Sequence, residues 1–275
     1  MTSVIPEAPP VAPSRAPLAT EQEAREVAEA AREKDWEKPS FVRQLFEGRL
    51  RLDLIHPYPM QSEAEVAKAR PFMDRLERFL ADRVDSDKID RDGKIPPEVI
   101  QGLRELGAFG IKIPEEYGGL GLSQTSYTHA IGLVTSVDGS LTALLSAAQS
   151  IGVPQPLKLF GTPEQKKKYL PRLAKGAISA FALTESNVGS DPAAMGTTAV
   201  LSDDGAHWVL NGEKLWCTNG TRAELFVVMA RTPDVMVNGK PRKQITAFIV
   251  ERKWAGNCQG RCPGRCCNRA GCALG

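Results

Sequence analysis

Two short segments carry the side chains best suited to chemistry, and each follows an apolar, strand-like run. Both segments are rich in small and hydroxyl residues, so they can deliver backbone N–H groups and hydroxyls to one place. Such a place suits a planar cofactor with polar edges. The candidate cofactor-contacting residues are Phe181, Leu183, Thr184, Gly189, Ser190, Trp216, Cys217 and Thr218.

A flavin ring is a cofactor of this kind. Its faces need an apolar or aromatic wall, and its N1–C2=O edge needs donors because negative charge collects there on reduction. Thr184 and Thr218 are candidate donors, and Trp216 is the candidate wall. Gly189 would let the backbone approach a pyrophosphate without an intervening Cβ. The alternative is that both segments are ordinary polar turns, with Trp216 in the core.

The two segments also match a set of spaced motifs. Residues 184–191 have the form Thr-Glu-x-x-x-Gly-Ser-Asp, residues 211–214 the form Asn-Gly-x-Lys, and residues 216–220 the form Trp-x-Thr-Asn-Gly. In this combination the sequence resembles the acyl-CoA dehydrogenase family, over roughly residues 62 to 251. The long N-terminal lead and residues 245–252 are most similar to its very-long-chain branch.

The resemblance implies a flavoprotein oxidoreductase of fatty acid β-oxidation with FAD as its cofactor. Such an enzyme removes a proton from Cα of a fatty acyl-CoA and passes a hydride from Cβ to the flavin, which gives a trans-2-enoyl-CoA. Ser190 matches a serine that contacts substrate in the family. An electron-transfer flavoprotein or a similar acceptor would take the electrons, and family members form homodimers or homotetramers.

The family's catalytic base is a glutamate of a C-terminal helical bundle or of a helix at its start, and no residue here matches its position. We therefore expect an N-terminal fragment without that bundle, with no catalytic residue of its own and inactive alone. A non-catalytic protein-interaction module built on the same two domains is the alternative. Flavin absorbance in the purified protein would favour the first hypothesis, and a colourless protein that captures a partner would favour the second.

A change of hydrophobic period predicts an α+β fold, with an all-α domain followed by an antiparallel β domain. Helical spacing of apolar residues predicts helices over residues 62–85, 96–106, 124–137, 140–151 and 162–175. Short apolar runs separated by turn residues predict strands at 180–183, 197–201, 207–210, 214–217, 225–230 and 245–250. We assign a flexible proline-rich and charged lead to 1–38, the helical domain to 39–176, the β domain to 177–252 and a tail to 253–275. An apolar patch within residues 41–55 could dock on the body of the protein or on a partner, and we expect the body.

Composition excludes several classes of function. The chain is 42% hydrophobic and 25% charged, as in ordinary globular proteins. No apolar run approaches the roughly 20 residues of a membrane span. The net charge of +2 arises in the tail, so the body gives no sign of a nucleic-acid partner. Cys217 is the only cysteine of the body and no signal peptide is visible, which predicts a reduced, cytoplasmic protein.

No metal site is expected. The three histidines are scattered, and five of the six cysteines lie in the tail with the spacing Cys-x3-Cys-x3-Cys-Cys-x4-Cys. This spacing fits neither the usual zinc pairs nor the common cluster-binding runs. The Gly, Ala, Arg, Cys and Pro content of the tail is what GC-rich codons give in a wrong frame. We interpret residues 253–275 as disordered or out of frame.

The lead through residue 38 should be dispensable for folding, because its composition offers little apolar surface to bury. Limited proteolysis followed by mass spectrometry should show that the lead is trimmed first. Cleavage that starts within residues 140–176 while the lead survives would contradict this.

Overall fold

The computed structural model describes residues 39–57, 60–237, 239–254 and 265–272. The predicted flexible lead lies outside the described residues, as do two parts of the tail, 255–264 and 273–275.

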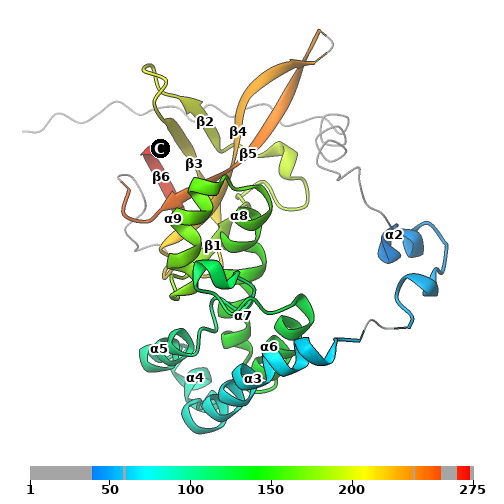
Figure 1. The fold of residues 1–275 in the computed structure, drawn as a ribbon. Coiled ribbons are helices and arrows are strands. Elements are labelled where there is room, and N and C mark those ends of the chain that lie inside the picture. Colours follow the sequence, from blue (N-terminus) through cyan, green and yellow to red (C-terminus); the bar gives the residue numbers. More distant parts are fainter. Residues whose placement is uncertain (1–38, 58–59, 238, 255–264, 273–275) are drawn as a thin grey trace, which may run out of the picture.

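Helices make up the first part of the described chain (Figure 1). They are α2 (Phe41–Phe46), α3 (Glu63–Arg83), α4 (Ser86–Asp92), α5 (Pro97–Glu105), α6 (Gln124–Thr135), α7 (Gly139–Ser146), α8 (Pro154–Phe160) and α9 (Pro163–Ala174). Capping boxes begin α3 at Ser62 and α9 at Thr162, which confirms both predicted starts. The seven-residue helices α4 and α8 were not predicted, because two turns are too short to show a helical period.

A six-stranded sheet follows the helices. Its strands are β1 (Ser179–Ala182), β2 (Thr198–Leu201), β3 (Trp208–Leu215), β4 (Leu225–Val237), β5 (Lys240–Glu251) and β6 (Arg265–Cys272). The order is β1-β4-β2-β3-β6, with β5 paired to β4. The predicted succession of helices and then strands is confirmed. The prediction of a purely antiparallel domain is wrong at β1 and β2, which both pair parallel with β4. In each case other chain segments intervene and make the crossover that a parallel pair requires.

Strand β3 runs through Asn211 and Gly212 without the predicted turn. A Cβ at Gly212 would lie 2.4 Å from the Thr197 Oγ1 and 2.6 Å from the Thr197 Cα. Glycine is therefore required here by the close approach of Thr197, and not by a hairpin.

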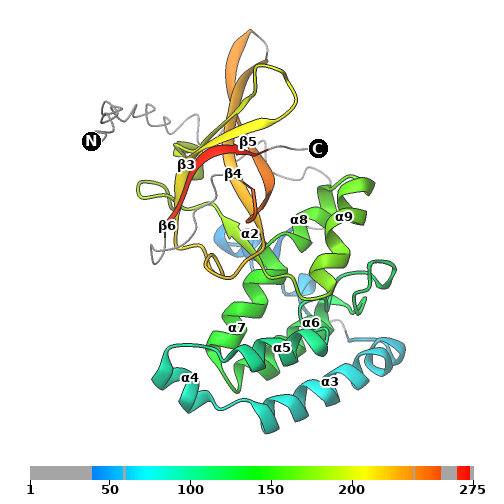
Figure 2. The ribbon, with the colours of Figure 1, turned by 90° about the vertical axis from the view of Figure 1, so that its left-hand side faces the viewer.

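Part of the tail lies in the sheet. Residues 265–272 pair antiparallel with β3 along its whole length (Figure 2). This corrects the expectation of disorder for these residues. The physical reason is that the outer edge of β3 offers backbone N–H and C=O groups that an extended segment can join whatever its side chains.

Residues 225–230 of β4 pack on both faces of the sheet, whereas Val235 and Met236 in its second half are exposed. Leu225 and Val227 pack with residues of α8 and α9, whereas Phe226 and Val228 pack with the cluster formed by α3, α5, α6 and α7. Figure 2 shows these helices below and beside the sheet. Burial on both faces explains why residues 225–230 form a continuous apolar run and do not alternate.

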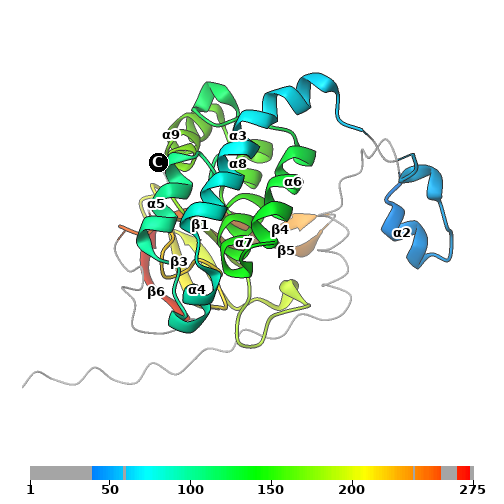
Figure 3. The ribbon, with the colours of Figure 1, turned by 90° about the horizontal axis from the view of Figure 1, so that it is seen from below.

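Helix α2 stands apart from the other helices (Figure 3). Its Val42, Leu45 and Phe46 are exposed, and Phe46 retains 89% of its accessible surface. The expected docking of this apolar patch on the body is therefore wrong. Leu50, Leu52 and Ile55 of the same apolar patch are exposed as well.

Replacing Leu170, which is fully buried on α9, by alanine should lower the free energy of unfolding by about 2–5 kcal/mol, because it leaves a cavity between α9 and the sheet. Urea unfolding would measure the change. Lys167→Ala on the exposed side of the same helix is the control and should change it by less than about 0.5 kcal/mol. Equal effects of the two variants would contradict this packing.

Candidate cofactor site

The ends of strands β1 and β3 lie side by side. The Leu215 N–H donates to the Thr184 carbonyl over 2.8 Å, and the Cys217 Sγ donates to the Phe181 carbonyl over 3.2 Å. These bonds bring together the two motif segments that are far apart in the sequence. What the segments bind stays a prediction.

The two candidate donors keep their hydroxyls available. Thr184 is half-buried and Thr218 is exposed. Among the described residues, neither hydroxyl takes part in a hydrogen bond. Each can therefore donate to a ligand without breaking a bond within the protein.

Trp216 lies on the surface. It is 81% exposed, and its φ of +50° is uncommon for a bulky residue. The alternative that Trp216 belongs to the core is therefore excluded. A backbone conformation of this kind costs on the order of 1–3 kcal/mol, and such strain is often found at functional sites.

Asn219 fixes the loop that presents Trp216 and Thr218. Its φ is +67°, and its Nδ2 donates to the Leu144 carbonyl over 3.0 Å and to the Ser179 carbonyl over 3.3 Å. The loop is thereby attached to α7 and to the start of β1.

The positions of the other candidate residues give no sign of a particular role. Gly189 and Ser190 are exposed, and a Cβ at Gly189 would meet no described atom within 4 Å, so no neighbour in the described part of the chain requires glycine there. Phe181 is half-buried against the α8 and α9 cluster. Leu183 is half-buried, and its carbonyl accepts from Lys214 Nζ over 3.0 Å.

Sequence reasoning missed the role of two motif residues, Glu185 and Lys214. Their side chains form a salt bridge of 2.7 Å and are 10% and 3% exposed. Burial alone would raise the pKa of Glu185, but hydrogen bonds from Lys214, Thr197 and the Gly196 N–H outweigh it and lower the pKa. Burial lowers the pKa of Lys214, and Glu185 opposes that shift. The available signal in the sequence was Lys214, a lysine within the strand-like run of β3. A lysine that is buried in a strand needs a carboxylate as its partner.

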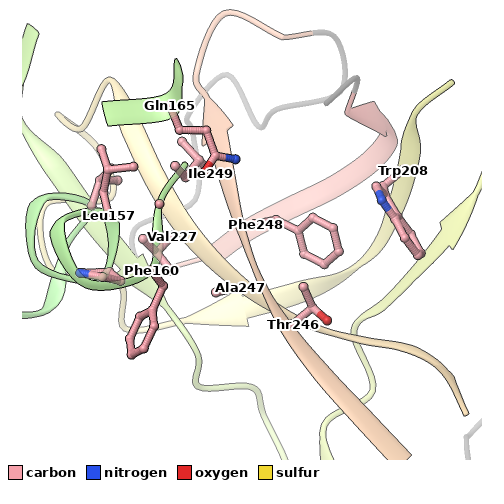
Figure 4. Close-up of a pocket in the computed structure, with 12 residues that line it drawn as sticks. Leu157, Phe160, Gln165, Trp208, Val227, Thr246, Ala247, Phe248 and Ile249 are labelled. Atoms are coloured by element: carbon pink, nitrogen blue, oxygen red, sulfur yellow. The ribbon is translucent and has the colours of Figure 1, made fainter. Parts of the chain in front are cut away.

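A separate apolar pocket lies between α8 and β5 (Figure 4). Leu157 and Phe160 line one side, and Phe248 and Trp208 line the other. None of the candidate cofactor-contacting residues lines it. The pocket is therefore distinct from the junction of β1 and β3.

The described residues include neither a metal-binding cluster nor a membrane-spanning helix. No group of three or more His, Cys, Asp or Glu residues could hold a metal ion within the part of the chain that the structure describes. In the same part, no helix is both long enough and apolar enough to cross a membrane.

The chemistry of the junction fits a flavin ring. Two hydroxyls that have no partner among the described residues supply donors for a polar edge, and an exposed tryptophan supplies an aromatic wall. Thr184 is held by the hydrogen bond from the Leu215 N–H to its carbonyl. The loop that carries Trp216 and Thr218 is held by the bonds of Cys217 and Asn219 to neighbouring elements.

Comparison with known proteins identifies the class. The family pattern "Acyl-CoA dehydrogenase, N-terminal domain" matches residues 67–177, and "Acyl-CoA dehydrogenase, middle domain" matches residues 180–262. The chain belongs to the acyl-CoA dehydrogenase family. The second match runs past residue 251, where the sequence motifs had placed the end of the resemblance.

Individual relatives agree with this assignment. The chain is 56% identical over 232 residues to "Probable acyl-CoA dehydrogenase FadE10" of Mycobacterium tuberculosis, covering 84% of this chain and 35% of the relative. It is 40% identical over 227 residues to the human "Very long-chain specific acyl-CoA dehydrogenase, mitochondrial", covering 82% and 34%. The chain thus spans about a third of the length of the curated relatives it matches.

Solved structures show the same fold. The acyl-CoA dehydrogenase of Bacillus anthracis, solved in complex with FAD, is 32% identical with a TM-score of 0.59. The match covers 77% of this chain and 36% of that one.

Acidification should destabilise the protein through Glu185. Its pKa in the folded state lies below the ordinary value of 4.5, so its contribution is complete above that pH and is lost as the pH falls through the folded value. Replacing Glu185 by Gln should cost about 3–5 kcal/mol at pH 7, because Lys214 is left buried without its partner. The difference in urea unfolding free energy between the two proteins should shrink below pH 4.5.

Glu116→Gln, at an exposed position, is the control and should leave stability nearly unchanged at every pH. A Glu185→Gln effect of constant size from pH 7 to pH 3 would show that the carboxylate is not the titrating group.

Proposed function

We propose that this chain supplies the flavin-contacting part of an FAD-dependent acyl-CoA dehydrogenase. The observation that carries the proposal is the junction of β1 and β3, where Thr184 and Thr218 keep available hydroxyls beside an exposed Trp216. Family membership supports it. When bound, FAD accepts a hydride from Cβ of a fatty acyl-CoA while a base removes the Cα proton, which gives a trans-2-enoyl-CoA.

Each residue has a proposed task. Thr184 and Thr218 donate to the polar edge of the ring, and Trp216 covers one side of it. Ser190, exposed in the loop after β1, contacts either the cofactor pyrophosphate or the pantetheine arm of the substrate. Phe181, Leu183, Gly189 and Cys217 complete the predicted contact set.

The residues described here do not supply the base in this proposal. No motif residue of this chain matches the family's catalytic glutamate, so we expect flavin binding without turnover when the chain is tested alone. An electron-transfer flavoprotein as acceptor, a homo-oligomeric assembly and a cytoplasmic location belong to the same proposal.

A non-catalytic interaction module is the second candidate. The exposed apolar side chains of α2, Val42, Leu45 and Phe46, favour it. The absorbance spectrum of the purified protein separates the two, because bound flavin absorbs in the visible range and an interaction module would be colourless.

Replacing Thr184 and Thr218 together by valine should weaken FAD binding by about tenfold or more, because each change removes one donor of a ligand hydrogen bond. Quenching of flavin fluorescence during titration measures the affinity. Thr221→Val, at another exposed threonine in the same loop, is the matched control and should have no effect. Unchanged affinity in the double variant would remove the assignment of both residues.

A further inference from the structure

The ion pair of Glu185 and Lys214 forms hydrogen bonds with several separate segments of the chain. The Glu185 Oε1 accepts from Lys214 Nζ over 2.7 Å and from the Thr197 N–H and Oγ1 over 3.0 Å and 2.5 Å. The Glu185 Oε2 accepts from the Gly196 N–H over 2.7 Å. One carboxylate therefore joins the end of β1, the start of β2 and the end of β3.

Lys214 holds the chain on both sides of Thr184. Its Nζ donates to the carbonyl of Leu183 and to the carboxylate of Glu185. The carbonyl of Thr184 itself accepts from the next residue of β3, Leu215. Three successive residues, Leu183, Thr184 and Glu185, are thus each hydrogen-bonded to β3.

Trp216 and Thr218 lie two and four residues after Lys214 in the chain. A group that fixes Lys214 to the segment 183–185 therefore also sets the distance between Thr184 and the Trp216–Thr218 segment. Because the pair is neutral overall, it imposes this geometry without adding net charge beside the junction.

Resting on the proposed function, we propose that Glu185 and Lys214 are positioning residues for the flavin. They hold the Thr184 hydroxyl at a fixed separation from Trp216 and Thr218 and do not contact the cofactor themselves. The loop 186–197 is held in the same way, through Gly196 and Thr197.

Gly212 offers an independent way to disturb the same geometry. A Cβ there would overlap with Thr197, whose N–H and hydroxyl both bind the carboxylate. Gly212→Ala should therefore displace Thr197 and loosen the site while both charged residues remain in place.

The protein offers a matched control at the opposite end of β1. Glu251 is also buried and is paired with Arg172 over 3.0 Å, and it lies beside Leu225, which in turn pairs with Ser179 at the start of β1. Glu251→Gln removes a buried carboxylate of similar kind without touching the junction. A role limited to general stability predicts equal effects of Glu185→Gln and Glu251→Gln.

The experiment compares Glu185→Gln, Lys214→Met, Lys214→Arg, Gly212→Ala and Glu251→Gln at a temperature where circular dichroism shows each to be folded. FAD is titrated into each protein and its fluorescence is followed. Glu185→Gln, Lys214→Met and Gly212→Ala should bind FAD at least about tenfold more weakly, a loss equivalent to one or two hydrogen bonds. Lys214→Arg should recover part of the affinity because it restores the charge, and Glu251→Gln should match the unchanged protein.

A second measurement does not depend on the cofactor. Amide hydrogen exchange in flavin-free protein should become faster across residues 184–197 and 215–218 in Glu185→Gln and not in Glu251→Gln. Unchanged FAD affinity in Glu185→Gln, or an equal loss in Glu251→Gln, would overturn the positioning role while leaving the proposed function in place. If the unchanged protein binds no FAD, the proposed function itself is wrong and the positioning role falls with it.

Discussion

A carboxylate removed from water has to be neutralised and fully hydrogen-bonded, and this requirement shapes the junction where β1, β2 and β3 meet. Glu185 meets it with the Lys214 ammonium, the Thr197 N–H and hydroxyl, and the Gly196 N–H. Its donors come from segments that share no local structure. The pair can therefore form only when all of them have reached their places, which makes the junction a cooperative unit. Gly212 belongs to that unit, because its missing Cβ is the space that Thr197 occupies.

Burial of β1 and β4 between two helical layers supplies the rigid base beneath this junction. Residues on one face of β4 pack with α8 and α9, and those on the other face pack with the larger helical cluster. Hydrogen bonds join the layers as well: the Ser179 hydroxyl donates to the Ala148 carbonyl and accepts from the Val153 N–H. A motion of the helices relative to the sheet would break both packing and bonds. The strands are covered by helices along their buried parts, so the side chains available to a ligand are those that follow the strand ends.

The contrast between these fixed backbones and the side chains that they carry bears on function. Trp216 is exposed in a strained conformation, and the hydroxyls of Thr184 and Thr218 have no partners among the described residues. Each of these features is unfavourable or neutral for folding. Together, on a backbone that is held by a buried ion pair and by Asn219, they are the arrangement expected of a site built before its ligand arrives.

The sequence alone determined the order of helices and strands, the capped starts of α3 and α9, and the motifs that place the chain in its family, because periodicity, capping and spacing are local properties. It also singled out Thr184, Trp216 and Thr218. Only the tertiary structure decided that β1 pairs parallel with β4, that Asn211 and Gly212 continue a strand, and that α2 stands free of the body. The partnership of Glu185 with Lys214 also appeared only there, since pairing across the sheet depends on which segments meet in space, and no local pattern records that contact.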